Sequence, residues 1–585
     1  MIRYLKYLLP YWWQIILLFA GLVIQVWSTL QLPDMMSHIV NDGIVGGDQD
    51  LILSKGLQML VVALIGGVGM VISGFFASRI GAGFARRVRD DLFNTVMKFS
   101  ITELDNFSTS SLITRTTNDI YQVQQVTIMI LRMSCQAPIM GVGAILKALD
   151  TAPGLTWIIA MAVAVLFGVI MVVFSFGIPK FTKLQKLVDK LNTVARENLT
   201  GLRVVRAFNN EKYEEEKFKN ANNELTKVNL FVTRLMVIIF PIVQLLFNFT
   251  TLLVIWVGAK YIESGAIEIG NLMAFMQYAM QVMMSFMLLA MVFIMVPRGM
   301  VSWKRINEVL STKTSIKPPI SPKKPSNKIK GNIEFKDVNF SYPDAEDPIL
   351  CNISFNIKKG QTTAFIGSTG SGKSTLINLI PRFYDVSNGE ILIDGVNVKD
   401  YDPDELMKKI GYVSQKGVLF SGTIASNISF GKKINDKQIK QAAKIAQASD
   451  FISRQDKKYK SRIDQGGANI SGGQKQRLSI ARAIAKNPEI LIFDDSFSAL
   501  DFRTDKKLRQ ALEKVTKETT VLIVAQRVGT IKSADQIVVL DNGKIAGIGK
   551  HYELLKDCSV YREIAQSQLS EAEMKIELNK AKEVK

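Results

Sequence analysis

The sequence predicts an α-helical membrane domain of six spans followed by a soluble α/β domain organised around a phosphate loop. The 585-residue chain is too long for a single domain. Its first half holds six apolar segments, each long enough to cross a hydrocarbon core that needs roughly 20 residues. Its second half alternates strand-like and helix-like stretches and contains Gly367–Ser374, which fits the pattern GxxxxGK[ST] without a mismatch.

The predicted spans are approximately Trp12–Leu32, Gly56–Ala77, Met133–Leu149, Thr156–Ile178, Leu235–Ile262 and Ile269–Val296. The first ten residues are basic and amphipathic and lack a small-residue cleavage site. We therefore expect a short helix on the inner membrane surface rather than a removable signal.

The chain has a net charge of +20, and the Lys and Arg residues of its apolar half are concentrated in the loops between spans two and three and between spans four and five. That placement is typical of the cytoplasmic side of a membrane protein and does not indicate nucleic acid as a partner. Both termini are then expected in the cytoplasm. Each of these two loops has about fifty residues with helical periodicity, so spans two to five should continue as long cytoplasmic helices.

Two features of the membrane half leave alternatives open. The loop tips Ser108–Arg115 and Gly201–Phe208 are either docking elements for a soluble domain or solvated turns. The last span carries methionines at helical spacing beside Gln277, Gln281 and Ser285. This stripe suits either a promiscuous pathway or helix packing. Spans four to six have no acidic residue in their middles, which disfavours a proton relay there.

The phosphate loop lies between a predicted buried strand, Thr362–Ile366, and a helix that begins near Thr375. Its glycines let successive backbone N–H groups surround a phosphate chain at a helix N-terminus, where the dipole is positive. Lys373 is placed to reach the outer phosphates, and the Ser374 hydroxyl is the expected Mg²⁺ ligand. We predict that a nucleoside triphosphate binds Gly367, Ser368, Thr369, Gly370, Ser371, Gly372, Lys373, Ser374 and Thr375.

Four further features suit the same task. Asp494 ends an apolar strand, a pattern that holds Mg²⁺ beside a triphosphate. Gln415 follows another strand-like run and could reach Mg²⁺ or the attacking water, and Tyr342 could stack on a base. Taken singly, these last two also suit ordinary surface or core roles. The run Ile470–Arg477 offers a hydroxyl, glycine amides and a helix N-terminus, which make a second anion site.

The few cysteines and histidines do not indicate a metal site or a catalytic histidine. Cys135, Cys351 and Cys558 lie far apart without metal-ligand spacing, so we expect reduced thiols. His38 and His551 are the two histidines, and neither is near the motifs above.

In this order the motifs resemble those of half-size ABC exporters, over nearly the whole chain. The resemblance implies a transmembrane domain 1–312 and a nucleotide-binding domain 331–569. The stretch 313–330 is rich in Pro, Lys and Ser, which is typical of a linker, and the acidic and basic tail 570–585 is expected to be a solvated extension, either helical or irregular. It assigns Gln415 as the Q-loop residue, Ser471, Gly472, Gly473 and Gln474 to the signature, and Asp501 to the D-loop, with Ser374, Gln415 and Asp494 on Mg²⁺. The loop tips 100–125 and 197–218 match the family's coupling helices.

The family works as dimers. Two nucleotide-binding domains enclose two ATP molecules, each between one domain's phosphate loop and the other's signature. The resemblance therefore implies ATP and Mg²⁺ as ligands and alternating access driven by ATP.

Two catalytic positions depart from the family pattern. Asp495 stands where the family has a glutamate as general base, and its carboxylate is set back by about a bond length, while misplacement of about 1 Å can cost on the order of 10²-fold in rate. Gln526 stands where a histidine is expected after the strand Thr520–Ala525. Glutamine can donate a hydrogen bond to a phosphate but cannot titrate.

A complete signature beside two altered catalytic residues resembles the degenerate subunit of bacterial heterodimeric multidrug exporters. The expected partner is a second half-transporter with the catalytic glutamate and histidine, in the cell membrane. The alternatives are a homodimer with slow ATPase and a nucleotide-gated channel or regulatory subunit. The apolar, acid-poor membrane half suits amphipathic drugs, lipids or lipid-like compounds as substrates.

Overall fold

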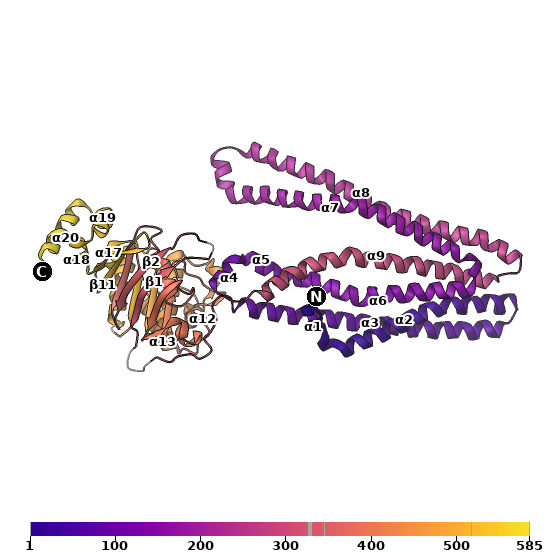
Figure 1. Ribbon diagram of the computed structural model, residues 1–585, viewed down its shortest axis with the longest axis horizontal. Helices are drawn as coiled ribbons and strands as arrows, with labels where there is room; N and C mark the ends of the chain where they lie inside the picture. The colour runs from indigo at the N-terminus through magenta and orange to yellow at the C-terminus, as the bar shows by residue number, and fades with distance from the viewer. Residues whose placement is uncertain (1, 326–329, 344, 516–517, 584–585) are drawn as a thin grey trace. The chain divides into compact units, whose positions relative to one another are not determined.

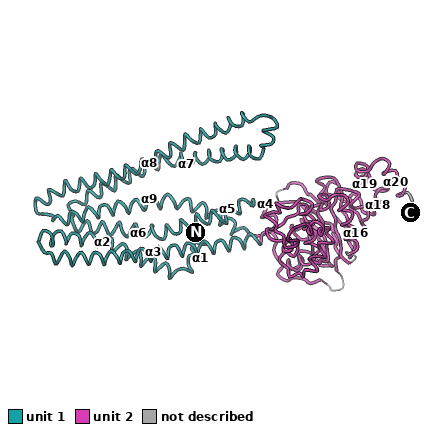
Figure 2. The backbone as a smooth tube through the Cα atoms, turned by 180° about the vertical axis from the view of Figure 1, so that it is seen from behind, with its two compact units in different colours: residues 1–97, 108–312 teal, residues 98–107, 313–585 magenta. Residues whose placement is uncertain are grey.

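The computed structural model describes residues 2–325, 330–343, 345–515 and 518–583, in two compact units (Figure 2). The first unit comprises residues 1–97 and 108–312, and the second comprises residues 98–107 and 313–585. The boundary is therefore crossed in the segment between the second and third predicted spans as well as at the linker. A short segment from within the helical half belongs to the soluble unit.

The first unit is built of long helices (Figure 1). Within the described residues, six helical runs are long and apolar enough to cross a membrane, so the chain is a multi-pass membrane protein. The predicted extension of spans two to five beyond the length of a membrane span is confirmed, because their helices have 48, 32, 52 and 53 residues. The helices are α1 (Ile2–Leu8), α2 (Trp12–His38), α3 (Gln49–Val96), α5 (Thr109–Thr114), α6 (Ile120–Thr151), α7 (Thr156–Ala207), α8 (Glu211–Glu263) and α9 (Ile269–Ser311).

Small residues let α2 and α3 approach closely. A Cβ on Gly21 would lie 2.9 Å from the Gly69 carbonyl oxygen, and the Ser28 hydroxyl donates to the Val62 carbonyl at 2.7 Å. Such contacts are the usual means of helix association in membranes. The α7–α8 hairpin packs on α9 through a small cluster that includes Leu166 and Met283.

The polar stripe and the methionines of the last span lie in different environments. Gln281 donates to the Thr29 carbonyl at 3.1 Å, and the buried Ser285 hydroxyl donates to the Val282 carbonyl, so these two residues pack between helices. Met280 and Met291 lie on an exposed side of α9, 45% and 48% accessible. The packing alternative is confirmed for Gln281 and Ser285, and the methionine face keeps the pathway alternative open.

The soluble unit contains a six-stranded sheet in the order β12-β11-β3-β10-β9-β6, a four-stranded sheet β2-β1-β4-β5 and a small β7-β8 pair among its described residues. In the larger sheet β11, β3, β10, β9 and β6 are parallel and β12 is antiparallel. The strands are β1 (Ile333–Phe340), β2 (Leu350–Ile357), β3 (Thr362–Gly367), β4 (Asn388–Ile393), β5 (Val396–Asn397), β6 (Ile410–Val413), β7 (Gly422–Thr423), β8 (Arg462–Ile463), β9 (Ile490–Asp494), β10 (Thr520–Val524), β11 (Gln536–Asp541) and β12 (Lys544–Gly549).

Helices cover this unit. They are α4 (Ile101–Asn106), α10 (Lys373–Leu379), α11 (Pro403–Lys409), α12 (Ile424–Ser429), α13 (Asp436–Ile445), α14 (Ser449–Ser453), α15 (Gly472–Ala485), α16 (Phe502–Val515), α17 (Val528–Ile531), α18 (His551–Asp557), α19 (Ser559–Gln566) and α20 (Glu571–Glu583).

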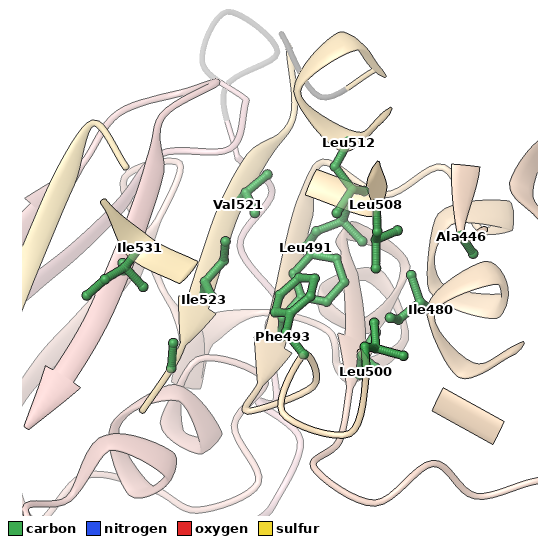
Figure 3. Packing of buried hydrophobic residues seen from close by; sticks show 14 of the residues in the cluster. Ala446, Ile480, Leu491, Phe493, Leu500, Leu508, Leu512, Val521, Ile523 and Ile531 are labelled. Atoms are coloured by element: carbon green, nitrogen blue, oxygen red, sulfur yellow. The ribbon is translucent and has the colours of Figure 1, made fainter. Parts of the chain in front are cut away.

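Alternate residues of the central strands enter two separate cores. Leu491, Phe493, Val521 and Ile523 lie in the cluster drawn in Figure 3, whereas their neighbours Ile490, Ile492, Leu522 and Val524 lie in the other cluster. Both faces of the parallel sheet are therefore covered. That explains why these strands are continuous apolar runs in the sequence.

The segment α4 is held on the soluble unit by its capping residue. The buried Glu103 accepts the Ser100 N–H at 2.8 Å and the Ser315 N–H at 3.0 Å, while Ile101 packs on the second core. The Tyr384 hydroxyl donates to Asp105 at 3.3 Å. The docking segment thus lies within the expected 100–125 range but precedes the tip that we expected to dock.

The expected tips themselves lie in the first unit. Ser108–Arg115 forms α5 and the start of a π-helical turn, where Arg115 pairs with Glu308 at 2.8 Å. The second tip ends α7, and its Phe208 side chain is 75% exposed. Docking by that second tip stays a prediction.

The described part of the C-terminal tail is helical, as one of the two alternatives predicted, but the expectation that it is solvated is wrong. Residues 571–583 form α20, whose Met574 and Ala581 are buried in the first core. Glu577 is also buried, pairs with Lys532 and lies 3.3 Å from His551 Nε2. The charge alternation suggested solvation, but one face of the helix packs on the domain.

Candidate functional site

The site is assembled at the carboxyl ends of four neighbouring parallel strands. The phosphate loop follows β3, Asp495 follows β9, Gln526 follows β10 and Gln415 follows β6. The strand register pairs Val524 with both Phe365 and Asp494, which brings these ends level. Ligand sites of parallel α/β sheets lie at this edge.

The phosphate loop has the backbone that its glycines were expected to allow. Gly370 and Gly372 have φ of 85° and 92°, a left-handed conformation that costs glycine least. The Lys373 ammonium donates to the Gly367 and Ser368 carbonyls at 3.0 and 2.6 Å. Burial lowers the pKa of Lys373, and the carboxylates at positions 495 and 494 oppose that shift.

Ser374 and Asp494 are brought together as predicted for a magnesium site. The Ser374 hydroxyl donates to Asp494 Oδ1 at 2.8 Å, and Tyr412 lies 3.3 Å from Asp494 Oδ2. Burial raises the pKa of Asp494, an effect that a bound cation would offset. One hydroxyl and one carboxylate are hard oxygen donors that suit Mg²⁺ completed by water and phosphate oxygens. The bound ion would neutralise phosphate charge there.

Gln415 is not part of that pair. Its Nε2 donates to Asp495 Oδ2 at 3.2 Å, and Gln526 Nε2 donates to the same oxygen at 2.9 Å. Asp495 itself has φ of 44°, and its backbone N–H donates to the Val524 carbonyl. The two positions that depart from the family pattern are therefore joined directly. Burial raises the pKa of Asp495, while its amide partner Gln415 opposes the rise.

The signature begins a helix in the expected way. Ser471 is the N-cap of α15, and its hydroxyl accepts the Gln474 N–H at 3.4 Å while Gln474 Oε1 accepts the Ser471 N–H at 3.2 Å. Gly472 and Gly473 form the first turn, where free N–H groups are available to an anion. This signature and the phosphate loop are separate parts of the same domain.

Two more predicted residues have defined positions. The Tyr342 ring packs edge-on against Phe340 and Tyr384, and its hydroxyl lies 3.0 Å from Thr375 Oγ1, beside the phosphate loop. Asp501 accepts the Thr504 N–H at 2.9 Å just before α16. The pKa of Asp501 is lowered by that threonine.

Sequence reasoning missed two residues that touch the site. Tyr412 lies near the end of β6, a strand that was recognised, but an aromatic residue within a strand carries no signal for a nucleotide site. The sequence around Gln568 contains no motif that indicates a role at the site. Its side chain forms two hydrogen bonds with the segment that follows β10. Its Nε2 donates to the Gln526 carbonyl at 2.6 Å, and its Oε1 accepts the Val528 N–H at 2.8 Å.

Known proteins show the same organisation. Residues 15–286 match the family described as the ABC transporter transmembrane region, and residues 350–498 match the ABC transporter family. An uncharacterized ABC transporter ATP-binding protein of Mycobacterium tuberculosis is 38% identical over 96% of this chain and 97% of its own length. The ATP-dependent lipid A-core flippase of Aliivibrio fischeri is 30% identical over 94% of this chain and 95% of its own.

The fold has a solved counterpart. The structure of a bacterial Atm1-family ABC exporter with ATP bound superposes with a TM-score of 0.80 at 25% identity, covering 96% of this chain and 99% of that one. The six apolar helical runs, the ATPase domain and the full-length relatives lead to one assignment. The chain belongs to the ABC transporter family and is a half-size, ATP-hydrolysing ABC exporter.

Proposed function

We propose that this chain is the degenerate-site subunit of a heterodimeric exporter. It would hold one ATP at Gly367–Ser374 with slow or no turnover. Its signature, Ser471–Gln474, would complete the hydrolytic site of a partner that supplies the missing glutamate and histidine. Both termini and the soluble domain would lie in the cytoplasm of a cell-membrane transporter.

The observation that supports this proposal most directly is the contact between the two altered positions. The carboxylate of Asp495 accepts hydrogen bonds from Gln415 and Gln526 on one oxygen. A general base must reach the attacking water, and a shorter side chain engaged by two amides is poorly placed to do so. Gln526 cannot carry the charge that a protonated histidine would bring to a phosphate.

The signature supports the other half of the proposal. Ser471 keeps the capping geometry that directs the first N–H groups of α15 outward. In a sandwich dimer those groups would contact the ATP that the partner binds. Altered catalytic residues beside a complete signature support a division of work in which this chain's own site holds ATP and its signature serves the partner's site.

The substrate class follows from the membrane half. Its exposed methionines on α9 are soft and adaptable, and spans four to six have no acidic residue in their middles. The relatives include ATP-dependent lipid A-core flippases. We infer an amphipathic or lipid-like substrate, such as a hydrophobic drug or a lipid.

The test compares ATPase rates of the full-length chain alone and with candidate partner chains. We expect the lone chain to be nearly inert and a partner to restore turnover. In that complex Ser471→Ala should abolish turnover, whereas Asp495→Ala, the matched change in this chain's own site, should leave it within about twofold.

A homodimer gives the opposite pattern. Brisk hydrolysis by the lone chain that Asp495→Ala abolishes would make Asp495 a working base and would overturn the proposal. A lone chain that is inert but gains turnover from Asp495→Glu with Gln526→His would support it, because the defect would then reside in those two side chains.

A further inference from the structure

A cavity of about 670 Å³ opens on the surface of the helical unit, and none of its lining residues belongs to the nucleotide site. One end is apolar and is formed by α3. The other end is polar and is formed by α3 together with one residue of α6. The apolar lining residues are Met70, Val71, Gly74 and Phe75, and the polar ones are Ser78, Arg79 and Arg132.

The two arginines lie at the same depth, at one edge of the predicted membrane core. No charged residue occurs on α3 between Lys55 and Arg79. At 1.5 Å per residue that interval measures about 36 Å, slightly more than a hydrocarbon core of about 30 Å. A Cβ on Gly81 would meet Ile128 of α6, so Arg132, one turn further along that helix, lies near the level of Arg79.

Neither arginine has an acidic partner. Among the described residues, no ion pair or hydrogen bond is formed by Arg79 or Arg132, and no acidic side chain lines the cavity. The Arg79 guanidinium lies 6.0 Å from the centre of the Phe75 ring. By contrast, Arg115 pairs with Glu308 at 2.8 Å. Two unpaired cations beside an apolar surface favour an anionic ligand.

The apolar end is one face of α3. Met70, Val71, Gly74 and Phe75 recur at helical spacing along about two turns of that helix. An added Cβ on Gly74 would have no neighbour within 4 Å, so the middle of this face is open to a hydrocarbon chain. A ligand that fits both ends carries a phosphate at one end and a hydrocarbon chain at the other.

We propose that this cavity binds an anionic phospholipid. Its phosphate lies between Arg79 and Arg132, and one acyl chain follows Met70, Val71, Gly74 and Phe75 towards the membrane centre. With the orientation proposed above, the lipid comes from the inner leaflet. This lipid is a bound component of the transporter and differs from its cargo.

The test measures lipid retention by the full-length protein in detergent, without nucleotide, by native mass spectrometry. The probes are phosphatidylglycerol, phosphatidylcholine and glycerol 1-phosphate. We expect one phosphatidylglycerol to bind the natural protein in preference to phosphatidylcholine. Arg79→Gln with Arg132→Gln should weaken that binding roughly 10- to 30-fold. Each basic residue near an anionic lipid contributes a comparable share of the binding free energy, and the double variant loses two such shares.

Two further variants test the arginine end and the apolar end of the cavity separately. Arg86→Gln removes an exposed arginine that does not line the cavity and should leave binding unchanged. Gly74→Leu should crowd the apolar face of α3 and weaken phosphatidylglycerol binding without altering the arginines. Equal binding by the double arginine variant, or full binding of glycerol 1-phosphate alone, would overturn the proposal.

A second chain is the competing occupant of the cavity. In the assembled transporter, Gly74→Cys should react with a membrane-soluble maleimide and should lose that reactivity when phosphatidylglycerol is added. Protection of this cysteine by the second subunit in the absence of lipid would overturn the proposal. Because no step involves hydrolysis, these results are independent of the heterodimer test.

Discussion

Replacing Gln568 with alanine should loosen the segment that follows β10. The natural side chain bonds the Gln526 carbonyl at 2.6 Å and the Val528 N–H at 2.8 Å. A typical hydrogen bond contributes about 0.5–1.5 kcal/mol net, and these two are partly open to water, so together they should contribute about 1–2 kcal/mol. Local opening should then become about 5- to 30-fold more frequent.

Amide hydrogen exchange measures that change directly. The Val528 amide is the donor to Gln568, so its exchange should accelerate by the same factor in Gln568→Ala. Gln568→Glu keeps an oxygen for the Val528 N–H but cannot donate to the Gln526 carbonyl, and should retain most of the protection. Ser567→Ala, the matched control, changes a neighbour whose hydroxyl donates to the Ile564 carbonyl of α19. Unchanged exchange at Val528 in Gln568→Ala would refute the reasoning.

Three further results are expected. Glu103→Gln should speed hydrogen exchange across residues 98–107, because the Ser100 and Ser315 N–H groups bond different oxygens of the buried carboxylate and an amide has only one oxygen; unchanged exchange would contradict this. Gly372→Ala should weaken titrated ATP binding more than tenfold, since φ is 92° and the new Cβ would lie 2.7 Å from a Leu350 methyl. The third concerns His551, whose pKa is lowered by burial despite the neighbouring carboxylate of Glu577 and with Lys532 assisting. The unfolded chain then binds the proton more readily, so stability should fall as pH drops below 6.5, and His551→Phe should remove that slope in melting temperatures measured from pH 5 to 7.

The phosphate loop and the strand ends were predictable because local rules determine them. A buried strand, a glycine loop and a helix start occupy one short stretch, and Thr362–Gly367 and Lys373–Leu379 form as expected. Asp494 was identified for the same reason, as the acid that ends an apolar strand. The long helices also followed from periodicity and hydropathy.

Contacts between distant segments were not predictable in the same way. Asp495 and Gln526 were each recognised as departures, but their mutual hydrogen bond depends on β9 and β10 being neighbours. Ser100 and Glu103 form a capping box, which is a sequence pattern typical of a helix start. That pattern does not predict the surface against which the helix packs. Glu577 lies in a charged stretch, and its burial depends on Lys532 and His551, which are far away in the sequence.

The ten residues 98–107 have a practical consequence for anyone who isolates the soluble domain. A gene fragment that starts at the linker would encode every strand of both large sheets and yet omit part of the domain's own surface. Ser315 would lose the carboxylate that accepts its N–H, Tyr384 would lose Asp105, and the patch under Ile101 would meet water. Stability and nucleotide affinity measured on such a fragment would be those of a domain that lacks part of its native packing. A synthetic peptide spanning residues 98–107, added in trans, offers a simple repair.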